Sequence, residues 1–278
     1  MHLIADSGST KTHWCLIEGK VIIKELFTKG INPFYQEKHD IEQDLAANLL
    51  PGLSGYSINR ISFYGAGCSF PEKKLIVFEA LGRFFKNTVI EVESDLLGAA
   101  RSLCGNSAGI ACILGTGSNS CYYDGNEIIE NVSPLGFILG DEGSGAVLSK
   151  KLVSDCLKKQ LPAHIIEKFM AQYSLTPAII LENVYKKPFP NRYLAQFTPF
   201  LSENIHENSI MNIVSAGFRE FFRRNLAQYP EGLSVGFIGS VAYHLQTVLN
   251  QVAAEENFVI SKIEKSPVFG LTEYYQSN

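Results

Sequence analysis

Cysteine patterns typical of a metal site or a disulfide framework are missing from this sequence. The six cysteines stand singly, with no C-x-x-C pair and no histidine at ligand spacing, so reduced and mostly buried thiols are expected. No apolar stretch reaches the roughly 20 residues of a membrane span. The apolar run before Asp6 is too short for a signal peptide. We therefore expect a soluble, cytoplasmic protein with no membrane partner.

An excess of charge of either sign is also missing. Lysine and arginine together number 24 and aspartate and glutamate 28, which gives a net charge of −4, and the basic residues form no stripe. This balance argues against a nucleic-acid partner. The 278 residues are 46% hydrophobic, which is enough for one large core or two ordinary ones. One or two domains are expected.

An internal repeat is the most informative feature that the sequence does contain. The first copy covers residues 3–23 and places the turn DSGSTKT, residues 6–12, between two apolar runs. The second copy covers residues 110–129 in the same order, around the turn GTGSNS at residues 115–120. Apolar runs joined by glycine-containing turns are typical of an antiparallel meander. The repeat predicts duplicated α/β lobes with two phosphate-type turns on opposite walls of one cleft.

The turn DSGSTKT is the first candidate phosphate site. Gly8 allows close backbone approach, and successive N–H groups in such a turn form an anion-binding nest. Ser9, Thr10 and Lys11 can add donors, and Asp6 at the strand end can hold a hydrated Mg²⁺. An ordinary polar hairpin loop explains the same residues about equally well. The turn is not a Walker A loop, because a strand rather than a helix follows it.

The turn GTGSNS is the second candidate. Gly115 and Gly117 would bring backbone amides to a phosphate, and Thr116 adds a hydroxyl donor. Glycine-rich hairpins are common, so the motif is weak alone. Its pairing with the first turn through the repeat makes the phosphate interpretation stronger.

Acidic residues near predicted helix starts are candidates for chemistry. Asp95 follows the strand 89–92 and could accept a proton from a substrate hydroxyl, although Ser94 or Asp95 could equally cap a helix. In GDEGSG, residues 140–145, helix capping and the helix dipole explain Asp141 and Glu142. The surrounding glycines suggest a chain held tightly against something.

Helical periodicity covers much of the remaining chain. It predicts a helix over residues 36–50 and further helices over 163–173, 176–185 and 209–227. A strand over residues 234–238 ends in Gly239 and Ser240 and opens another helix. This strand-to-helix turn either packs against a nucleotide base or simply turns the chain.

Five motifs in order, DSGSTKT, ESDLLGAA, GTGSNS, GFILGDEGSGA and GFIGSVA, resemble the N-acetylglucosamine kinase family. That family belongs to a wider group that contains the ATPase activators of benzoyl-CoA reductase and 2-hydroxyacyl-CoA dehydratase, within the sugar kinase and actin superfamily. The match spans residues 6–270. It implies an α/β fold of two ribonuclease-H-like lobes, 1–107 and 108–278, with ATP and sugar meeting in an interdomain cleft. The second lobe carries helical insertions, and the last residues are candidates to return to the first.

The resemblance also implies a role for individual residues. Asp95 matches the catalytic aspartate, which is expected to deprotonate a sugar hydroxyl, most simply the 6-hydroxyl, while Mg²⁺ bridges the β- and γ-phosphates of ATP. Asp6 is the expected metal contact. The expected nucleotide contacts are Asp6, Gly8, Ser9, Thr10, Lys11, Gly115, Thr116, Gly117, Thr198, Gly239 and Ser240. The expected contacts to an amino sugar are Asn32, Asp95, Ser118, Asn119, Gly136 and Asp141.

The sequence departs from the family pattern in three respects. The chain is short, residues 176–208 match only loosely, and little follows Gly270, so any C-terminal helix is abbreviated. These departures leave the sugar open among N-acetylglucosamine, glucosamine and N-acetylmuramic acid. A homodimer would suit the family.

Three other functions compete with a kinase. An ATPase activator would need cysteines arranged for an iron–sulfur cluster between subunits, and that arrangement is missing. A non-catalytic sugar or nucleotide sensor could lose its base, yet Asp6, Asp95, Thr116 and Asp141 are all present. A filament subunit would have no use for the GDEGS segment.

Overall fold

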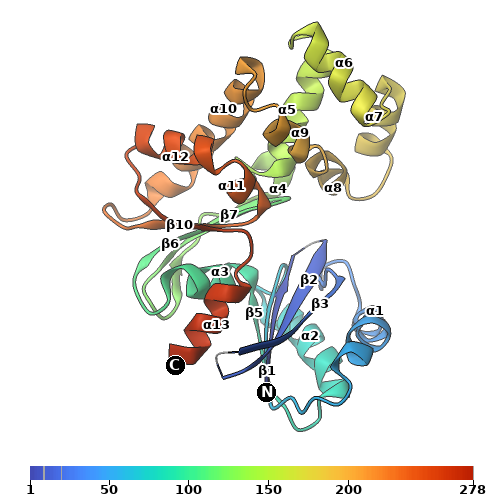
Figure 1. Ribbon diagram of the computed structural model, residues 1–278, viewed down its shortest axis with the longest axis vertical. Helices are drawn as coiled ribbons and strands as arrows, with labels where there is room; N and C mark the ends of the chain where they lie inside the picture. The colour runs from blue at the N-terminus through green and yellow to red at the C-terminus, as the bar shows by residue number, and fades with distance from the viewer. Residues whose placement is uncertain (9, 20, 278) are drawn as a thin grey trace. The chain divides into compact units, whose positions relative to one another are not determined.

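The computed structural model describes residues 1–8, 10–19 and 21–277, which form two compact units (Figure 1). The first unit comprises Met1–Ala108, Tyr123–Ile128 and Ser266–Asn278, and the second comprises Gly109–Tyr122 and Ile129–Lys265. Each unit is an α/β structure with a five-stranded sheet.

The sheet of the first unit has three antiparallel strands and two parallel additions. Strands β1 and β2 pair antiparallel, as do β2 and β3, while β4 runs parallel to β1 and β5 parallel to β4. The order across the sheet is β3 (Val21–Lys29), β2 (Lys11–Glu18), β1 (His2–Ser7), β4 (Arg60–Gly65) and β5 (Val89–Ser94).

The sheet of the second unit repeats this order. Across the sheet lie β8 (Ile128–Glu130), β7 (Ser118–Tyr123), β6 (Gly109–Leu114), β9 (Val235–Ile238) and β10 (Ile260–Glu264). Strand β9 is parallel to β6, and β10 is parallel to β9. Numbered within its own unit, each sheet therefore has the order 3-2-1-4-5. The predicted duplication and the ribonuclease-H-like α/β class are confirmed.

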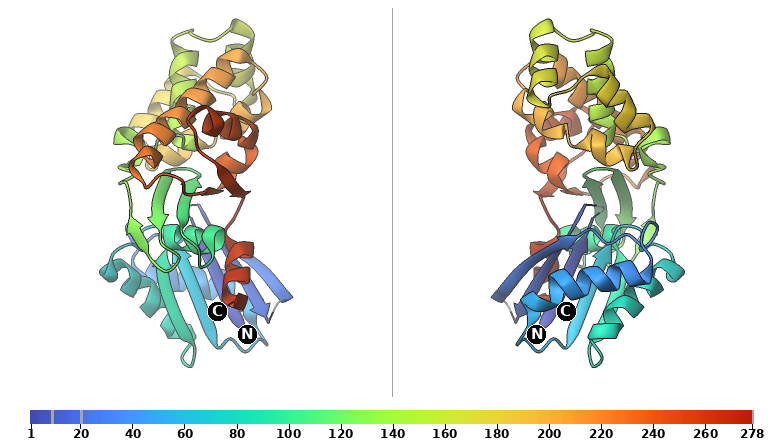
Figure 2. Two further views of the ribbon diagram at one scale, coloured as in Figure 1. Left: turned by 90° about the vertical axis from the view of Figure 1, so that its left-hand side faces the viewer. Right: turned by 90° about the vertical axis from the view of Figure 1, so that its right-hand side faces the viewer.

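Helices cover both faces of the first sheet, because successive apolar side chains of its strands point to opposite faces and both faces have to be buried. Leu3 and Trp14 belong to the core beneath α1 (Lys38–Asp44) and α2 (Pro71–Phe84), whereas Ile4 and Cys15 belong to a second cluster with Val268 of the C-terminal helix. Figure 2 shows α1 and α13 (Val268–Ser277) on opposite faces of this sheet. The predicted helix over residues 36–50 is wrong as a single element. It divides into α1, a π-helical turn (Leu45–Leu49) and a 3₁₀ turn (Leu50–Leu53), and proline at residue 51 cannot continue the α-helical hydrogen bonds.

A half-buried polar network joins α13 to α3 (Asp95–Cys104) and to the sheet. The Tyr275 hydroxyl lies 2.5 Å from the Tyr64 hydroxyl and donates to Glu91 at 2.9 Å. Arg101 of α3 donates to Glu91 at 2.7 Å and to the Tyr64 hydroxyl at 2.8 Å. The two charged side chains of this network, Arg101 and Glu91, therefore pair with each other.

The second unit adds a helical layer to its sheet. Helices α5 (Gly145–Leu157), α10 (Asn208–Arg224) and α12 (Gln246–Glu255) pack in one core with β6 and β9, and Phe169, Phe197 and Phe200 extend that core. The helices predicted over 163–173, 176–185 and 209–227 are present. The remaining helices are α4 (Gly136–Leu139), α6 (Ala163–Gln172), α7 (Pro177–Tyr185), α8 (Pro190–Ala195), α9 (Thr198–Glu203), a 3₁₀ turn (Leu226–Gln228) and α11 (Ser240–His244).

None of the helices in the described part of the chain combines the length and the apolarity that a membrane crossing needs.

Two helical glycines provide a matched test of packing. A Cβ atom at Gly98 of α3 would lie 2.8 Å from Cγ of Tyr64, whereas one at Gly82 of α2 would meet no described atom within 4 Å. We predict that Gly98→Ala lowers the free energy of unfolding by about 1–3 kcal/mol, because α3 must move away from β4. Gly82→Ala should leave it unchanged or raise it by up to about 1 kcal/mol. Urea unfolding followed by circular dichroism compares the two variants, and equal effects would contradict the predicted close packing.

Candidate functional site

The edge of the first sheet at which its parallel strands end gathers several predicted site residues. Ser7 of β1, Gly65 of β4 and Ser94 of β5 pair at one level across this edge. The chain after each strand therefore emerges at the same place, which is where open α/β sheets bind ligands. Asp6, the loop 65–71 and Asp95 are brought together in this way.

The first glycine turn is closed by a buried hydroxyl pair. Ser7 and Thr12 lie 2.7 Å apart through their hydroxyl oxygens, and the Ser7 hydroxyl also donates to the carbonyl of Ile31 at 3.1 Å. The Gly8 N–H donates to the Lys11 carbonyl at 3.1 Å. Ser9, a predicted nucleotide contact, lies outside the described residues.

Thr10 and Lys11 are exposed at this turn. The Lys11 ammonium lies 5.1 Å from the centroid of the Phe27 ring, on the neighbouring strand β3. A cation held over an aromatic face at the surface remains able to meet an anion. The two side chains are thus accessible donors on the first turn.

Two carboxylates interact unfavourably at the edge of the first sheet. Burial, followed by the negative charge of Asp95, raises the pKa of Asp6 to about 7, while Lys11 opposes the shift. Burial raises the pKa of Asp95 to about 6, against the stabilising N–H groups of Leu96 and of Asp95 itself. Carboxylates that share a poorly solvated site disfavour each other's ionised form.

Two neighbouring residues divide the roles that the sequence left open for Asp95. Ser94 caps the helix, which leaves Asp95 available for catalysis. Ser94 is the N-cap of α3, and its hydroxyl accepts from the Leu97 N–H at 3.2 Å. Asp95 is the first helical residue, and its Oδ1 accepts from the Leu96 N–H at 2.9 Å. Because Ser94 supplies the cap, the carboxylate of Asp95 is not needed for that role.

The residues around Asp6 fit a magnesium ion that takes few ligands from the protein and most of them from water and substrate phosphates. Among the described residues, no three histidine, cysteine, aspartate or glutamate side chains gather into a metal cage. Mg²⁺ commonly takes one or two carboxylates and completes its shell with water and phosphate oxygens. The raised pKa of Asp6 shows that its negative charge is poorly compensated, which a cation would relieve.

Asn32 is buried in a tight loop beside β4. Its N–H donates to Oε1 of Gln36 at 2.7 Å, and its Oδ1 accepts from the Phe34 N–H at 3.0 Å. A Cβ atom at Gly67 would lie 2.4 Å from this Oδ1, and Gly67 has a φ of +82°. Gly67, which was not predicted as a site residue, therefore has to be glycine for two reasons.

The second glycine turn is held against the start of α5. Gly145 and Ala146 donate their N–H groups to the carbonyls of Gly115 and Thr116, at 2.8 and 3.1 Å. A Cβ atom at Gly145 would lie 2.6 Å from Oγ1 of Thr198. The glycines of GDEGSG thus allow a close approach of helix and turn, as their spacing suggested.

Asp141 connects the second turn to the start of β7. Its Oδ1 accepts from the Ser118 N–H at 3.3 Å, and a Cβ atom at Gly117 would lie 3.0 Å from its Oδ2. Burial raises the pKa of Asp141 to about 6, and the charge of Glu142 adds to the effect, while the Ser118 N–H opposes it. Asn119 follows Ser118 and accepts from Nδ2 of Asn131 at 2.9 Å. Three of the predicted sugar contacts, Ser118, Asn119 and Asp141, therefore adjoin one turn.

Gly136 lies apart from these three residues in the contacts that the structure shows. It begins the short helix α4 with a φ of +74°, and a Cβ atom there would meet no described atom within 4 Å. The left-handed φ explains this glycine without any ligand.

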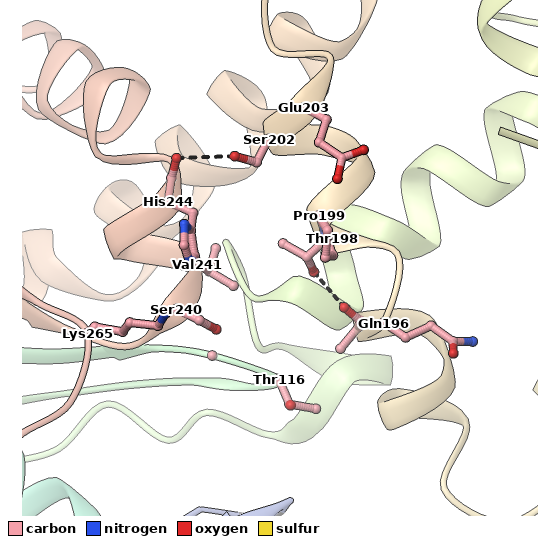
Figure 3. A pocket seen from close by; sticks show the side chains of 12 residues that line it. Thr116, Gln196, Thr198, Pro199, Ser202, Glu203, Ser240, Val241, His244 and Lys265 are labelled. Carbon is pink, nitrogen blue, oxygen red and sulfur yellow. Dashed lines mark hydrogen bonds between the residues drawn. The ribbon is translucent and has the colours of Figure 1, made fainter. Parts of the chain in front are cut away.

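A pocket of about 560 Å³ lies within the second unit (Figure 3). It brings together four predicted nucleotide contacts from segments far apart in the sequence: Gly115, Thr116, Thr198 and Ser240. A Cβ atom at Gly239, which precedes Ser240 and has a φ of +122°, would lie 2.2 Å from the carbonyl of Leu114. Only glycine permits the turn after β9 to lie against the end of β6.

Other residues of this pocket were not predicted. In Figure 3, Lys265 and His244 lie on the same side as Ser240, whereas Gln196 lies on the side of Thr198. Ser202 and Glu203 lie at the end away from Thr116. In the structure, Lys265 directly follows β10, the last strand. The remaining lining residues are Ala195, Pro199 and Val241.

No family model and no curated protein matches the chain.

Solved structures give clear matches. A proposed N-acetylglucosamine kinase from Porphyromonas gingivalis is 46% identical, with a TM-score of 0.98, over 100% of this chain and 99% of its own. A proposed N-acetylglucosamine kinase from Chromobacterium violaceum is 16% identical with a TM-score of 0.74, over 98% of each chain. A proposed N-acetylmannosamine kinase from Listeria monocytogenes is 13% identical with a TM-score of 0.53, over 99% of this chain and 98% of its own. The last two support the fold alone. The identity over the full length of the Porphyromonas protein shows that this chain belongs to the N-acetylglucosamine kinase family.

Proposed function

We propose that the protein is an ATP-dependent kinase that phosphorylates a hydroxyl, expected to be O6, of an amino sugar such as N-acetylglucosamine. The observation that carries this proposal is the poorly solvated carboxylate pair of Asp6 and Asp95 at the edge of the first sheet. A kinase needs one acidic group near the metal-bound phosphates and another at the attacking hydroxyl. Membership of the N-acetylglucosamine kinase family favours the same reaction.

The nucleotide is proposed to occupy the pocket of the second unit. Its volume of about 560 Å³ suits a small-molecule ligand. Thr198, Gly239 and Ser240 would lie toward the adenosine, and Gly115, Thr116 and Gly117 toward the phosphates. In the first unit, the proposed phosphate contacts are Asp6, Gly8, Thr10 and Lys11, together with Ser9.

Asp95 is proposed to act as the base. With a pKa of about 6 it is mostly ionised at pH 7 to 8, yet basic enough to accept a hydroxyl proton as the phosphoryl group is transferred. Mg²⁺, when bound, would neutralise charge on the β- and γ-phosphates. Asp6 would hold the ion through its carboxylate. The proposed contacts to the sugar are Asn32, Asp95, Ser118, Asn119, Gly136 and Asp141.

The cysteines do not favour an ATPase activator. Five of the six cysteines are buried, and Cys104 is half-buried. An iron–sulfur cluster shared between subunits would need thiolates at the surface. Burial also raises the pKa of Cys68 and of Cys156 to about 12, which disfavours the thiolate form that binds iron.

The kinase proposal is tested by incubating the protein with Mg-ATP and a panel of sugars and reading the products by mass spectrometry. The panel contains N-acetylglucosamine, glucosamine, N-acetylmuramic acid, N-acetylmannosamine and glucose. Asp95→Asn should lower kcat by about 10²–10⁴-fold, because the hydroxyl loses its proton acceptor. The control Asp40→Asn changes an exposed aspartate of α1 and should keep activity. If ATP binds but no sugar is phosphorylated, the proposed function is wrong.

Asp95→Asn should stabilise the protein while it removes activity. The pKa of Asp95 is about 6 in the folded chain, against 3.8 for an unperturbed aspartate, so the folded state binds the proton more tightly than the unfolded state. The ionised carboxylate therefore destabilises the fold above pH 6, and this cost disappears as the pH falls toward 4. Asp95→Asn should raise the free energy of unfolding at pH 8 by up to about 3 kcal/mol, and by less at pH 5. Thermal unfolding of both proteins at the two pH values, without ligands, measures the difference, and a variant less stable at pH 8 would refute the prediction.

A further inference from the structure

The loop that carries Asn32 is held from one side by α2. Lys73, in the first turns of that helix, donates from Nζ to the carbonyl of Pro33 at 3.0 Å. The same ammonium lies 4.8 Å from the centroid of the Phe34 ring. One cation therefore contacts a backbone acceptor and an aromatic face of consecutive residues.

These contacts act on the side chain of Asn32 through the backbone. The Phe34 N–H donates to Oδ1 of Asn32 at 3.0 Å, so the orientation of the carboxamide depends on where Phe34 lies. The Phe34 ring is 52% exposed and its ring neighbour Phe70 is 53% exposed, at a centroid distance of 6.2 Å. With this exposure, the ammonium of Lys73 is one of the few contacts that can orient the Phe34 ring.

We propose that Lys73 is a positioning residue for the sugar: it fixes Pro33 and Phe34 and thereby the carboxamide of Asn32. The inference rests on the proposed function, in which Asn32 contacts the sugar. The half-buried Lys73 is suited to this role because a charged donor makes a stronger hydrogen bond to a carbonyl than a neutral one. Nothing in this role involves the nucleotide pocket of the second unit.

Lys38 offers a matched control within the same unit. It also reaches α2, where its Nζ lies 2.7 Å from Oε2 of Glu79, but its side chain is 47% exposed and contacts neither Pro33 nor Phe34 in the interactions that the structure shows. Replacing it by methionine removes an ammonium and its salt bridge to α2, and leaves the contacts of Lys73 with Pro33 and Phe34 in place.

The experiment measures two properties of Lys73→Met, Lys73→Arg and Lys38→Met in the full-length chain. The first is backbone hydrogen exchange over residues 32–36 without ligands, by mass spectrometry. The second is the set of Michaelis constants for N-acetylglucosamine and for ATP. In Lys73→Met, exchange should accelerate and the Michaelis constant for the sugar should rise about tenfold, the size expected for a lost charged hydrogen bond. The constant for ATP should stay within about twofold.

The controls distinguish positioning from general damage to the fold. Lys73→Arg should restore most of the protection and of the sugar affinity, because the guanidinium keeps both the donors and the cation, and Lys38→Met should resemble the wild type. The inference is overturned if exchange over residues 32–36 is unchanged in Lys73→Met. It is also overturned if the constants for sugar and ATP rise together. If the wild type phosphorylates no sugar, the proposed function fails, while the exchange measurement still decides whether Lys73 holds the loop.

Discussion

The burial of two neighbouring carboxylates is the constraint around which the first unit is arranged. Asp6 lies one residue before the end of β1 and Asp95 begins the helix after β5, and burial raises the pKa of each, so ionising either carboxylate has a cost in the folded chain. Such a cost persists in a protein only where the surrounding structure holds the groups in place. A cation bound at Asp6 and a hydroxyl that donates a hydrogen bond to Asp95 would both lower this cost.

The rest of the first unit can be understood as support for this pair. Ser94 caps α3, so Asp95 starts the helix at its positive end, where an anion is stabilised. Farther along α3, Arg101 binds Glu91 of β5 and the hydroxyl of Tyr64 on β4. Gly98 lets the helix approach Tyr64 closely. The helix is therefore fixed at both ends and along its length, and Asp95 has little freedom to move away from Asp6.

The sequence predicted the parts of this structure that local rules determine. The repeated meander, the helices of the second unit and the role of glycine in GDEGSG follow from periodicity and from turn chemistry. The break in the helix over residues 36–50 was missed, because apolar spacing alone does not distinguish an α-helix from the π-helical and 3₁₀ turns that follow it here. Gly67 was missed because its need for glycine comes from Asn32, which lies 35 positions earlier and touches it only in the folded chain.

The pocket of the second unit shows why the remaining residues could not be predicted. Gly115, Thr198 and Lys265 come from three separate segments, and only the 3-2-1-4-5 order of the sheet places the ends of β6, β9 and β10 side by side. Motifs identify the glycines, because a backbone that approaches a ligand or another strand closely tolerates no side chain. They do not identify lysine or glutamate, which are common at any surface. A charged lining residue becomes a candidate only when the topology places it at the same sheet edge as a glycine turn. Lys265 follows β10, which places it beside the second turn.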